Sequence, residues 1–151
     1  MVRPIWYYSG IVSETVREGI SSFGNPLVWW AGILAFPYIL TLAIRKKDKY
    51  AAFLTIGYLA QYLPWFFVSR LTFIYHYFPS VFFVVLMIVY CFLQAKSRLS
   101  NRSFCTLLLL YGFATFFLFA LFYPVLSGQP IEAAFVDKWL RWFDSWVLVA
   151  R

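Results

Sequence analysis

FCTLLLLYGFATFFLFALFYPVL, the stretch from Phe104 to Leu126, holds 23 consecutive residues without a charged side chain. About 20 apolar residues in a helix, each rising about 1.5 Å, cross the ~30 Å hydrocarbon core of a bilayer. A helix is expected because an isolated span must satisfy its backbone hydrogen bonds internally. The stretch therefore predicts a transmembrane helix.

Three further apolar runs precede this one. They cover residues 27–44, 51–69 and 73–93, with 18, 19 and 21 residues, and His76 is the one basic side chain within them. The whole chain is 63% apolar and 13% charged, against about 45–50% and about 25% in soluble domains. We therefore expect an all-α membrane protein with four transmembrane helices in residues 27–126. A lead-in segment, residues 1–26, precedes them, and a tail, residues 127–151, follows.

The connections between the runs carry most of the positive charge. Residues 45–50 and 94–103 each have a net charge of +3, and the connection between the second and third runs holds Arg70 alone. Cytoplasmic loops are enriched in Lys and Arg. We therefore expect the two basic connections in the cytoplasm, and the Arg70 connection, the lead-in and the tail outside. Both termini are then extracytoplasmic.

The net charge of +7 raises the question of a nucleic-acid partner. A nucleic-acid binder collects its Lys and Arg in one surface patch, whereas here they lie in two short connections beside the membrane. We expect no nucleic acid, and membrane lipids as the partners of these bases. One histidine and two cysteines predict no metal site, and no phosphate-binding loop or nucleophile triad is present, so we expect no cofactor.

The lead-in has no signal-peptide pattern of basic start, apolar stretch and small-residue cleavage site. An external segment of 26 residues needs a means of crossing the membrane, and preceding spans would supply it. We therefore expect this chain to be the carboxy-terminal part of a larger membrane protein. The alternative is a self-contained four-helix protein whose short amino terminus crosses unaided.

Prolines and aromatic residues predict local structure. Asn25 before Pro26 is typical of a helix start, since Asn caps and Pro tolerates the first turn. Prolines inside the spans predict kinks, or else only shape the contacts between helices; they are Pro37, Pro64 and Pro79.

The tail repeats an aromatic spacing that is typical of one helix face. Four aromatic residues fall at positions i, i+3, i+4 and i+7, namely Trp139, Trp142, Phe143 and Trp146. This pattern predicts an amphipathic helix lying in the membrane interface, with burial against the protein as the alternative. The lead-in shows a weaker version of the pattern at Val12, Val16, Ile20 and Phe23.

Few residues are candidates for chemistry. Arg70 and His76 flank the turn between the second and third runs, with Tyr75 and Tyr77 beside the histidine. Arg70 could bind a lipid phosphate through its planar guanidinium, or extend to the headgroups as a purely structural arginine. His76 could donate to the same phosphate or move a proton, or be a packing residue. Glu14 and Glu18 would share a face if the lead-in were helical, which is more typical of a solvated face than of a catalytic pair.

Four sequence motifs resemble those of one known family. They are RPIWYYSG (3–10), GNPLVWW (24–30), YLPWFFVSR (62–70) and FIYHYFPS (73–80). In this order and spacing they resemble the carboxy-terminal four-span region of the protein O-mannosyltransferases, the dolichyl- or polyprenyl-phosphate-mannose:protein mannosyltransferases. The resemblance covers essentially the whole chain.

The resemblance implies transfer of mannose from a polyprenyl-phosphate carrier to a Ser or Thr hydroxyl of a protein, on the external face of the membrane. In such an enzyme we expect Arg70, His76 and Tyr77 to help bind the lipid phosphate. The family's essential acidic pair lies in an amino-terminal external loop that no position here matches. We therefore expect no catalytic residue in this chain and no activity from the chain alone. The expected partners are polyprenyl- or dolichyl-phosphate-mannose and the amino-terminal catalytic portion of the enzyme.

Two other functions remain open. A non-catalytic accessory membrane protein could use the same surface to bind carrier lipid or a partner subunit. A small transporter is disfavoured because the spans hold no paired charges and no internal repeat. The motifs look more like the prokaryotic branch of the family, which predicts a bacterial plasma membrane.

Overall fold

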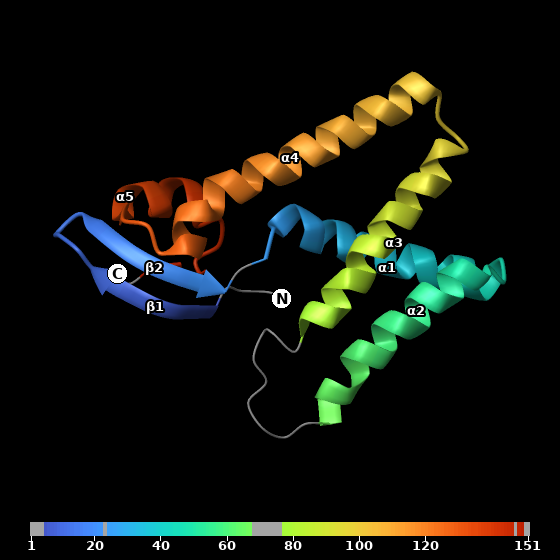
Figure 1. Ribbon diagram of the computed structural model, residues 1–151, viewed down its shortest axis with the longest axis horizontal. Helices are drawn as coiled ribbons and strands as arrows, with labels where there is room; N and C mark the ends of the chain where they lie inside the picture. The colour runs from blue at the N-terminus through green and yellow to red at the C-terminus, as the bar shows by residue number, and fades with distance from the viewer. Residues whose placement is uncertain (1–4, 23, 68–76, 147, 150–151) are drawn as a thin grey trace. The chain divides into compact units, whose positions relative to one another are not determined.

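The structure is a computed structural model that describes residues 5–22, 24–67, 77–146 and 148–149 (Figure 1). The chain forms two compact units. One, here called the helical unit, is Leu27–Gly112, and the other, the end unit, joins Met1–Pro26 with Phe113–Arg151. Each is described by itself.

Helices make up most of the described chain. They are α1 (Pro26–Arg45), α2 (Lys49–Tyr62), α3 (Phe78–Lys96) and α4 (Asn101–Ser127), as Figure 1 shows. Among the described residues, α1, α3 and α4 are each long and apolar enough to cross a membrane. The prediction of a mostly helical chain is confirmed, and the first, third and fourth apolar runs each correspond to a candidate membrane helix.

The second apolar run is less regular than the sequence predicts. Its α-helix, α2, has 14 residues and continues as a 3-10 turn, Leu63–Phe67. Pro64 has no N–H to donate to the carbonyl four residues earlier, which accounts for the end of the α-helix. At about 1.5 Å per α-helical and about 2.0 Å per 3-10 residue, the two pieces together are about 31 Å long. That length matches the ~30 Å hydrocarbon core.

The other prolines differ from one another in their effect. Pro37 lies inside α1, as predicted. Pro79 lies in the first turn of α3, which begins at Phe78, rather than inside a span. Its missing N–H has no intrahelical partner to lose there, so the predicted kink at Pro79 is wrong.

The core of the helical unit lies between α1, α2 and α3. Its fully buried side chains include Ile39 of α1 and Met87 of α3. Glycines bring the helices together: a Cβ added to Gly32 would lie 2.5 Å from Val84 of α3, and one added to Gly57 of α2 would meet the ring of Phe83. Small residues at helix contacts are the usual means of close approach between membrane helices.

Asp48 links α2 to α3 at one end of the helical unit. Its Oδ1 accepts hydrogen bonds from the backbone N–H groups of Tyr50 (2.9 Å) and Ala51 (3.1 Å), which caps α2. Its Oδ2 accepts a 2.6 Å hydrogen bond from the Tyr90 hydroxyl of α3. The end of α1, the start of α2 and the last turns of α3 therefore lie at the same end of the unit.

The end unit contains a small antiparallel sheet. Strands β1 (Ile5–Ile11) and β2 (Val16–Ser22) form a hairpin, and β3 (Ile131–Glu132) pairs with β2. The prediction of an all-α protein is therefore too narrow. The helical spacing in the lead-in is also misleading, because Val16 and Ile20 lie on a strand. Glu14 and Glu18 consequently share no helix face.

The hairpin and the tail pack against each other. The Ser21 hydroxyl donates a 2.8 Å hydrogen bond to the Leu148 carbonyl, and a Cβ on Gly19 would lie 2.9 Å from the same oxygen. A glycine is needed at this close approach. The core of the unit combines Phe122 and Val125 of α4 with the buried side chains of the tail.

The prediction of one continuous interfacial helix in the tail is wrong. The tail has a short helix, α5 (Ala133–Phe135), and a π-helical turn, Val136–Leu140, after which Arg141 leaves the helical conformation. Trp146 is 5% exposed and Trp139 is 55% exposed, so the aromatic residues do not share one face. Rings of Trp142 and Trp146 lie 5.5 Å and 6.4 Å from that of Phe122. The alternative of burial against the protein holds for Trp146.

Candidate functional site

Four aromatic residues gather at the end of the helical unit opposite Asp48. They are Trp29 in the first turn of α1, Tyr58 and Tyr62 on successive turns near the end of α2, and Tyr77 directly before α3. They meet because α1 begins, α2 ends and α3 begins at this end. We call them the tyrosine cluster.

Tyr77 is at the centre of the tyrosine cluster. Its hydroxyl lies 3.0 Å from that of Tyr58, and its ring lies 5.1 Å from Trp29 and 5.5 Å from Tyr62. The rings of Tyr58 and Tyr62 are stacked at 5.6 Å. Tilted, edge-on and offset aromatic pairs each stabilise by about 0.5–1.5 kcal/mol beyond area burial. The ring contacts thus fix Tyr77 to both neighbouring helices.

The hydroxyl pair has donor capacity beyond its own hydrogen bond. Each tyrosine carries one O–H hydrogen, and the bond between Tyr58 and Tyr77 uses one of the two. The other hydrogen is left for a second acceptor. Ser80, in the first turn of α3, has a fully buried hydroxyl without a hydrogen-bond partner in the described part of the chain.

The predicted site residues divide between described and undescribed parts of the chain. Tyr77 belongs to the tyrosine cluster, whereas Arg70 and His76 lie outside the described residues. In sequence, the connection that carries them runs between Tyr62 and Tyr77, so two members of the cluster flank it. Tyr58 was not among the predicted residues, although Tyr58 and Tyr62 are spaced i, i+4 on the second run and so share a helix face. No group of three His, Cys, Asp or Glu in the described residues could hold a metal ion.

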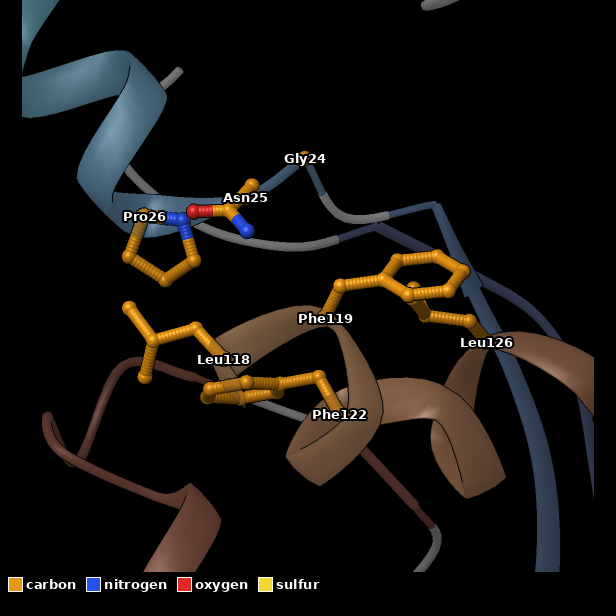
Figure 2. A pocket seen from close by; sticks show the side chains of 7 residues that line it. All are labelled: Gly24, Asn25, Pro26, Leu118, Phe119, Phe122 and Leu126. Atoms are coloured by element: carbon orange, nitrogen blue, oxygen red, sulfur yellow. The ribbon is translucent and has the colours of Figure 1, made fainter. Parts of the chain in front are cut away.

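The end unit has a pocket where α1 begins (Figure 2). Its volume is about 240 Å³, and Gly24, Asn25 and Pro26 face side chains of α4 across it, namely Leu118, Phe119, Phe122 and Leu126. The Asn25 amide donates a 2.8 Å hydrogen bond to the Thr115 carbonyl. Helix α1 begins at Pro26, as the Asn-Pro pair predicts. The GNPLVWW motif thus supplies one wall of this pocket and, through Trp29, one ring of the tyrosine cluster.

Comparison with known proteins gives the family. Residues 1–146 match a family model described as "C-terminal four TMM region of protein-O-mannosyltransferase". Protein O-mannosyl-transferase 2 of Danio rerio is 27% identical over 92% of this chain and 22% of its own length. Dolichyl-phosphate-mannose–protein mannosyltransferase 4 of Schizosaccharomyces pombe is 26% identical over 87% of this chain and 23% of its own length.

The chain spans about a fifth of the length of these relatives, and 18% of that of dolichyl-phosphate-mannose–protein mannosyltransferase 1 of Saccharomyces cerevisiae, which is 26% identical. No solved structure matches it. The match to the family model extends over the lead-in, all four apolar runs and most of the tail, in agreement with the four motifs. This multi-pass membrane chain therefore belongs to the protein O-mannosyltransferase family, and it corresponds to the carboxy-terminal four-transmembrane region.

Proposed function

We propose that this region binds the phosphate end of polyprenyl-phosphate-mannose during transfer of mannose to Ser or Thr of proteins. The observation that carries the proposal is the tyrosine cluster, which fixes Tyr77 beside the connection that holds Arg70 and His76. The names of the relatives, with dolichyl-phosphate-mannose among them, support this class of donor.

The proposed topology places this end of the helical unit outside. Cations at 45–49 and 96–102 lie in the connections after α1 and α3 and in the helix turns that border them. The positive-inside rule assigns those connections to the cytoplasm. In this topology α2 and its 3-10 turn form one span, the second in chain order, and α1, α3 and α4 form the other three. The tyrosine cluster then lies at the outer interface, where amphipathic Tyr and Trp rings are enriched. The membrane is proposed to be a bacterial plasma membrane.

The proposed chemistry concerns the leaving group. When the bond between the mannose C1 and the phosphate oxygen breaks, negative charge grows on the polyprenyl phosphate. Arg70 would hold two phosphate oxygens with its planar guanidinium, and the hydroxyl of Tyr77 and the imidazole of His76 would donate further hydrogen bonds. Fixed donors at the position where charge develops lower the barrier without reorganisation.

The proton of the acceptor hydroxyl needs a separate base. A general base must lie within about 3 Å of that hydroxyl, and the resemblance assigns the acidic pair to a loop that has no match in this sequence. We propose that the amino-terminal portion of the enzyme supplies the base. The 151-residue chain, incubated with polyprenyl-phosphate-mannose and an acceptor peptide, should transfer no mannose above background. Turnover that disappears on Glu14→Gln or Glu18→Gln would instead make one of those residues catalytic.

Binding of polyprenyl phosphate to Arg70 variants tests the proposal directly. A hydrogen bond to a charged group contributes about 1.5–3 kcal/mol, so Arg70→Ala should weaken binding by about ten- to hundredfold. Arg70→Lys keeps the charge but loses the planar fork, and should weaken binding less. Lys138→Ala, in the end unit and outside both lipid sites considered for the chain, is the matched control and should leave affinity unchanged. Affinity is measured together with the melting temperature, and unchanged affinity in a folded Arg70→Ala chain would refute the phosphate-binding role.

The second candidate is an accessory membrane protein that binds carrier lipid without taking part in catalysis. Adding the amino-terminal portion of a family member separates the two functions. Restored transfer that Arg70→Ala abolishes supports the mannosyltransferase region, and binding without restored transfer supports the accessory protein.

A further inference from the structure

We propose that a groove that reaches the basic end of the helical unit, opposite the tyrosine cluster, binds an anionic phospholipid, with one acyl chain in the groove and the phosphate on the connection between α3 and α4. This inference goes beyond the donor site, because it concerns a different ligand at the other end of the same helices.

The groove lies between α1, α3 and the first half of α4. Its volume is about 380 Å³. Small side chains, Ala31 and Ala35 on α1 and Ala95 on α3, leave the space, and Leu107 and Tyr111 of α4 line its other side. Apolar cavities of even ~150 Å³ stay dry and bind hydrocarbon. In a helix bundle at membrane depth, an open apolar groove of this size suits an acyl chain.

The positive charge beside the groove indicates that the headgroup of the ligand is negatively charged. The groove reaches Ala95 and Leu107, and the sequence between these two residues contains three cations and no acid, namely Lys96, Arg98 and Arg102. The Lys96 ammonium lies 5.9 Å from the centre of the Phe104 ring, over the start of α4. A hydrocarbon groove that ends beside three cations fits an amphiphile with a tail and a negatively charged head.

A second basic connection lies at the same end. Residues 45–49 add four cations, and Asp48 is the only acidic residue in 27–112. Both of its carboxylate oxygens already accept hydrogen bonds, from Tyr90 and from the start of α2. This end therefore keeps a net positive charge, which favours an anionic over a zwitterionic headgroup.

Position also distinguishes this lipid from the carrier. The tyrosine cluster lies at the start of α3 and Lys96 at its end, 19 residues along the helix. At about 1.5 Å per residue, the two ends are about 28 Å apart. A carrier phosphate at the tyrosine cluster cannot also contact Lys96, so a lipid phosphate at the basic end belongs to a separate molecule.

Lipid retention by the 151-residue chain in detergent, measured by native mass spectrometry, tests the proposal. Phosphatidylglycerol should be retained in preference to phosphatidylcholine. Replacing Lys96, Arg98 and Arg102 by Gln should lower retention by about fivefold per removed cation. Lys138→Gln, in the end unit, is the matched control and should have no effect. Equal retention of the two lipids by the unmodified chain would refute the proposal.

Filling the groove tests the acyl-chain position. Ala95→Phe should abolish the preference for phosphatidylglycerol, whereas Ala60→Phe, on the exposed surface of α2, should not. If Ala95→Phe retains phosphatidylglycerol normally, the lipid is held by surface charge and the groove assignment is wrong. Displacement of bound phosphatidylglycerol by an equal concentration of polyprenyl phosphate would assign the groove to the carrier and overturn the phospholipid.

Cys91 provides a measurement that needs no change in the groove. It lines the groove and is a free cysteine of intermediate exposure. In a chain with Cys105→Ser, phosphatidylglycerol should slow alkylation of Cys91 by N-ethylmaleimide, and phosphatidylcholine should not. An unchanged alkylation rate at saturating phosphatidylglycerol would contradict occupancy of the groove, even if Ala95→Phe failed to fold.

Discussion

The helical unit and the end unit are stabilised in different ways. In the helical unit, each helix satisfies its own backbone hydrogen bonds, and glycines at Gly32 and Gly57 allow close contact between helices. The end unit is held by pairing between distant parts of the chain. Its Ser21 hydroxyl donates to the Leu148 carbonyl, 127 residues away, and Val16 pairs with Glu132.

This difference determines how far a destabilising substitution should affect each unit. Membrane helices form as independent elements before they associate, so changes at one helix contact should leave the other helices intact. A sheet built from the two ends of the chain requires long-range closure, which is costly in entropy. Damage to the tail should therefore release the hairpin as well.

Labelling from outside would distinguish the two units most sharply. In a chain lacking Cys91 and Cys105, a cysteine at Lys47 in the helical unit should be protected from an impermeant thiol reagent. A cysteine at Gln129 in the end unit should react. The charge of the two basic connections is the physical reason. Reaction at both positions in sealed cells would contradict the proposed four-span topology.

The next largest effect is expected in the core of the end unit. Phe122 is 1% exposed and contacts Trp142 and Trp146. Phe122→Ala should destabilise the end unit by about 3–5 kcal/mol and expose both the hairpin and the tail to limited proteolysis. Phe116→Ala is the control, because Phe116 is 68% exposed on the same helix. If proteolysis of the tail left the hairpin protected, the two ends would not form one cooperative unit.

The sequence predicted local structure well and long-range structure poorly. The start of α1 was predictable because Asn25 and Pro26 act within one helical turn. The hairpin was missed although its two strands pair locally, because the spacing of Val12, Val16 and Ile20 also fits a helix. Its contacts with Leu148 and Glu132 join residues more than 100 positions apart in sequence. The aromatic spacing of the tail was misleading for the same reason: Trp146 is buried by contacts with α4 rather than by its own helix.

The candidate site was predictable to the same degree. Tyr77 was identified from its motif, together with Arg70 and His76. Its hydrogen-bond partner Tyr58 lies on another helix, 19 residues earlier, and became evident only when α2 and α3 were placed side by side. Both basic connections were evident from the sequence. The groove was not, since it depends on how the small side chains of α1 and α3 face α4.

Asp48 provides the smallest expected effect and tests whether a polar contact stabilises the helical unit. The Tyr90 hydroxyl and the Ala51 N–H hold the pKa of Asp48 below its ordinary value of 3.8. A carboxyl with a lowered pKa in the folded state stabilises that state above its unfolded pKa, and the contribution is lost as the pH falls through the folded pKa. Asn at this position still caps α2 but accepts only a neutral hydrogen bond from Tyr90.

Melting temperatures in detergent at about pH 7 and about pH 3 would measure this contribution, since the pKa window lies at the acidic end of that range. At the higher pH, Asp48→Asn should melt no more than a few degrees below the unmodified chain. At the lower pH the difference should shrink, because protonation removes the charge from the native carboxylate. Tyr90→Phe should reduce the same acid-dependent difference by removing its largest cause. An equal difference between Asp48→Asn and the unmodified chain at both pH values would show that the charge of Asp48 adds nothing to its contact with Tyr90 or to its cap of α2.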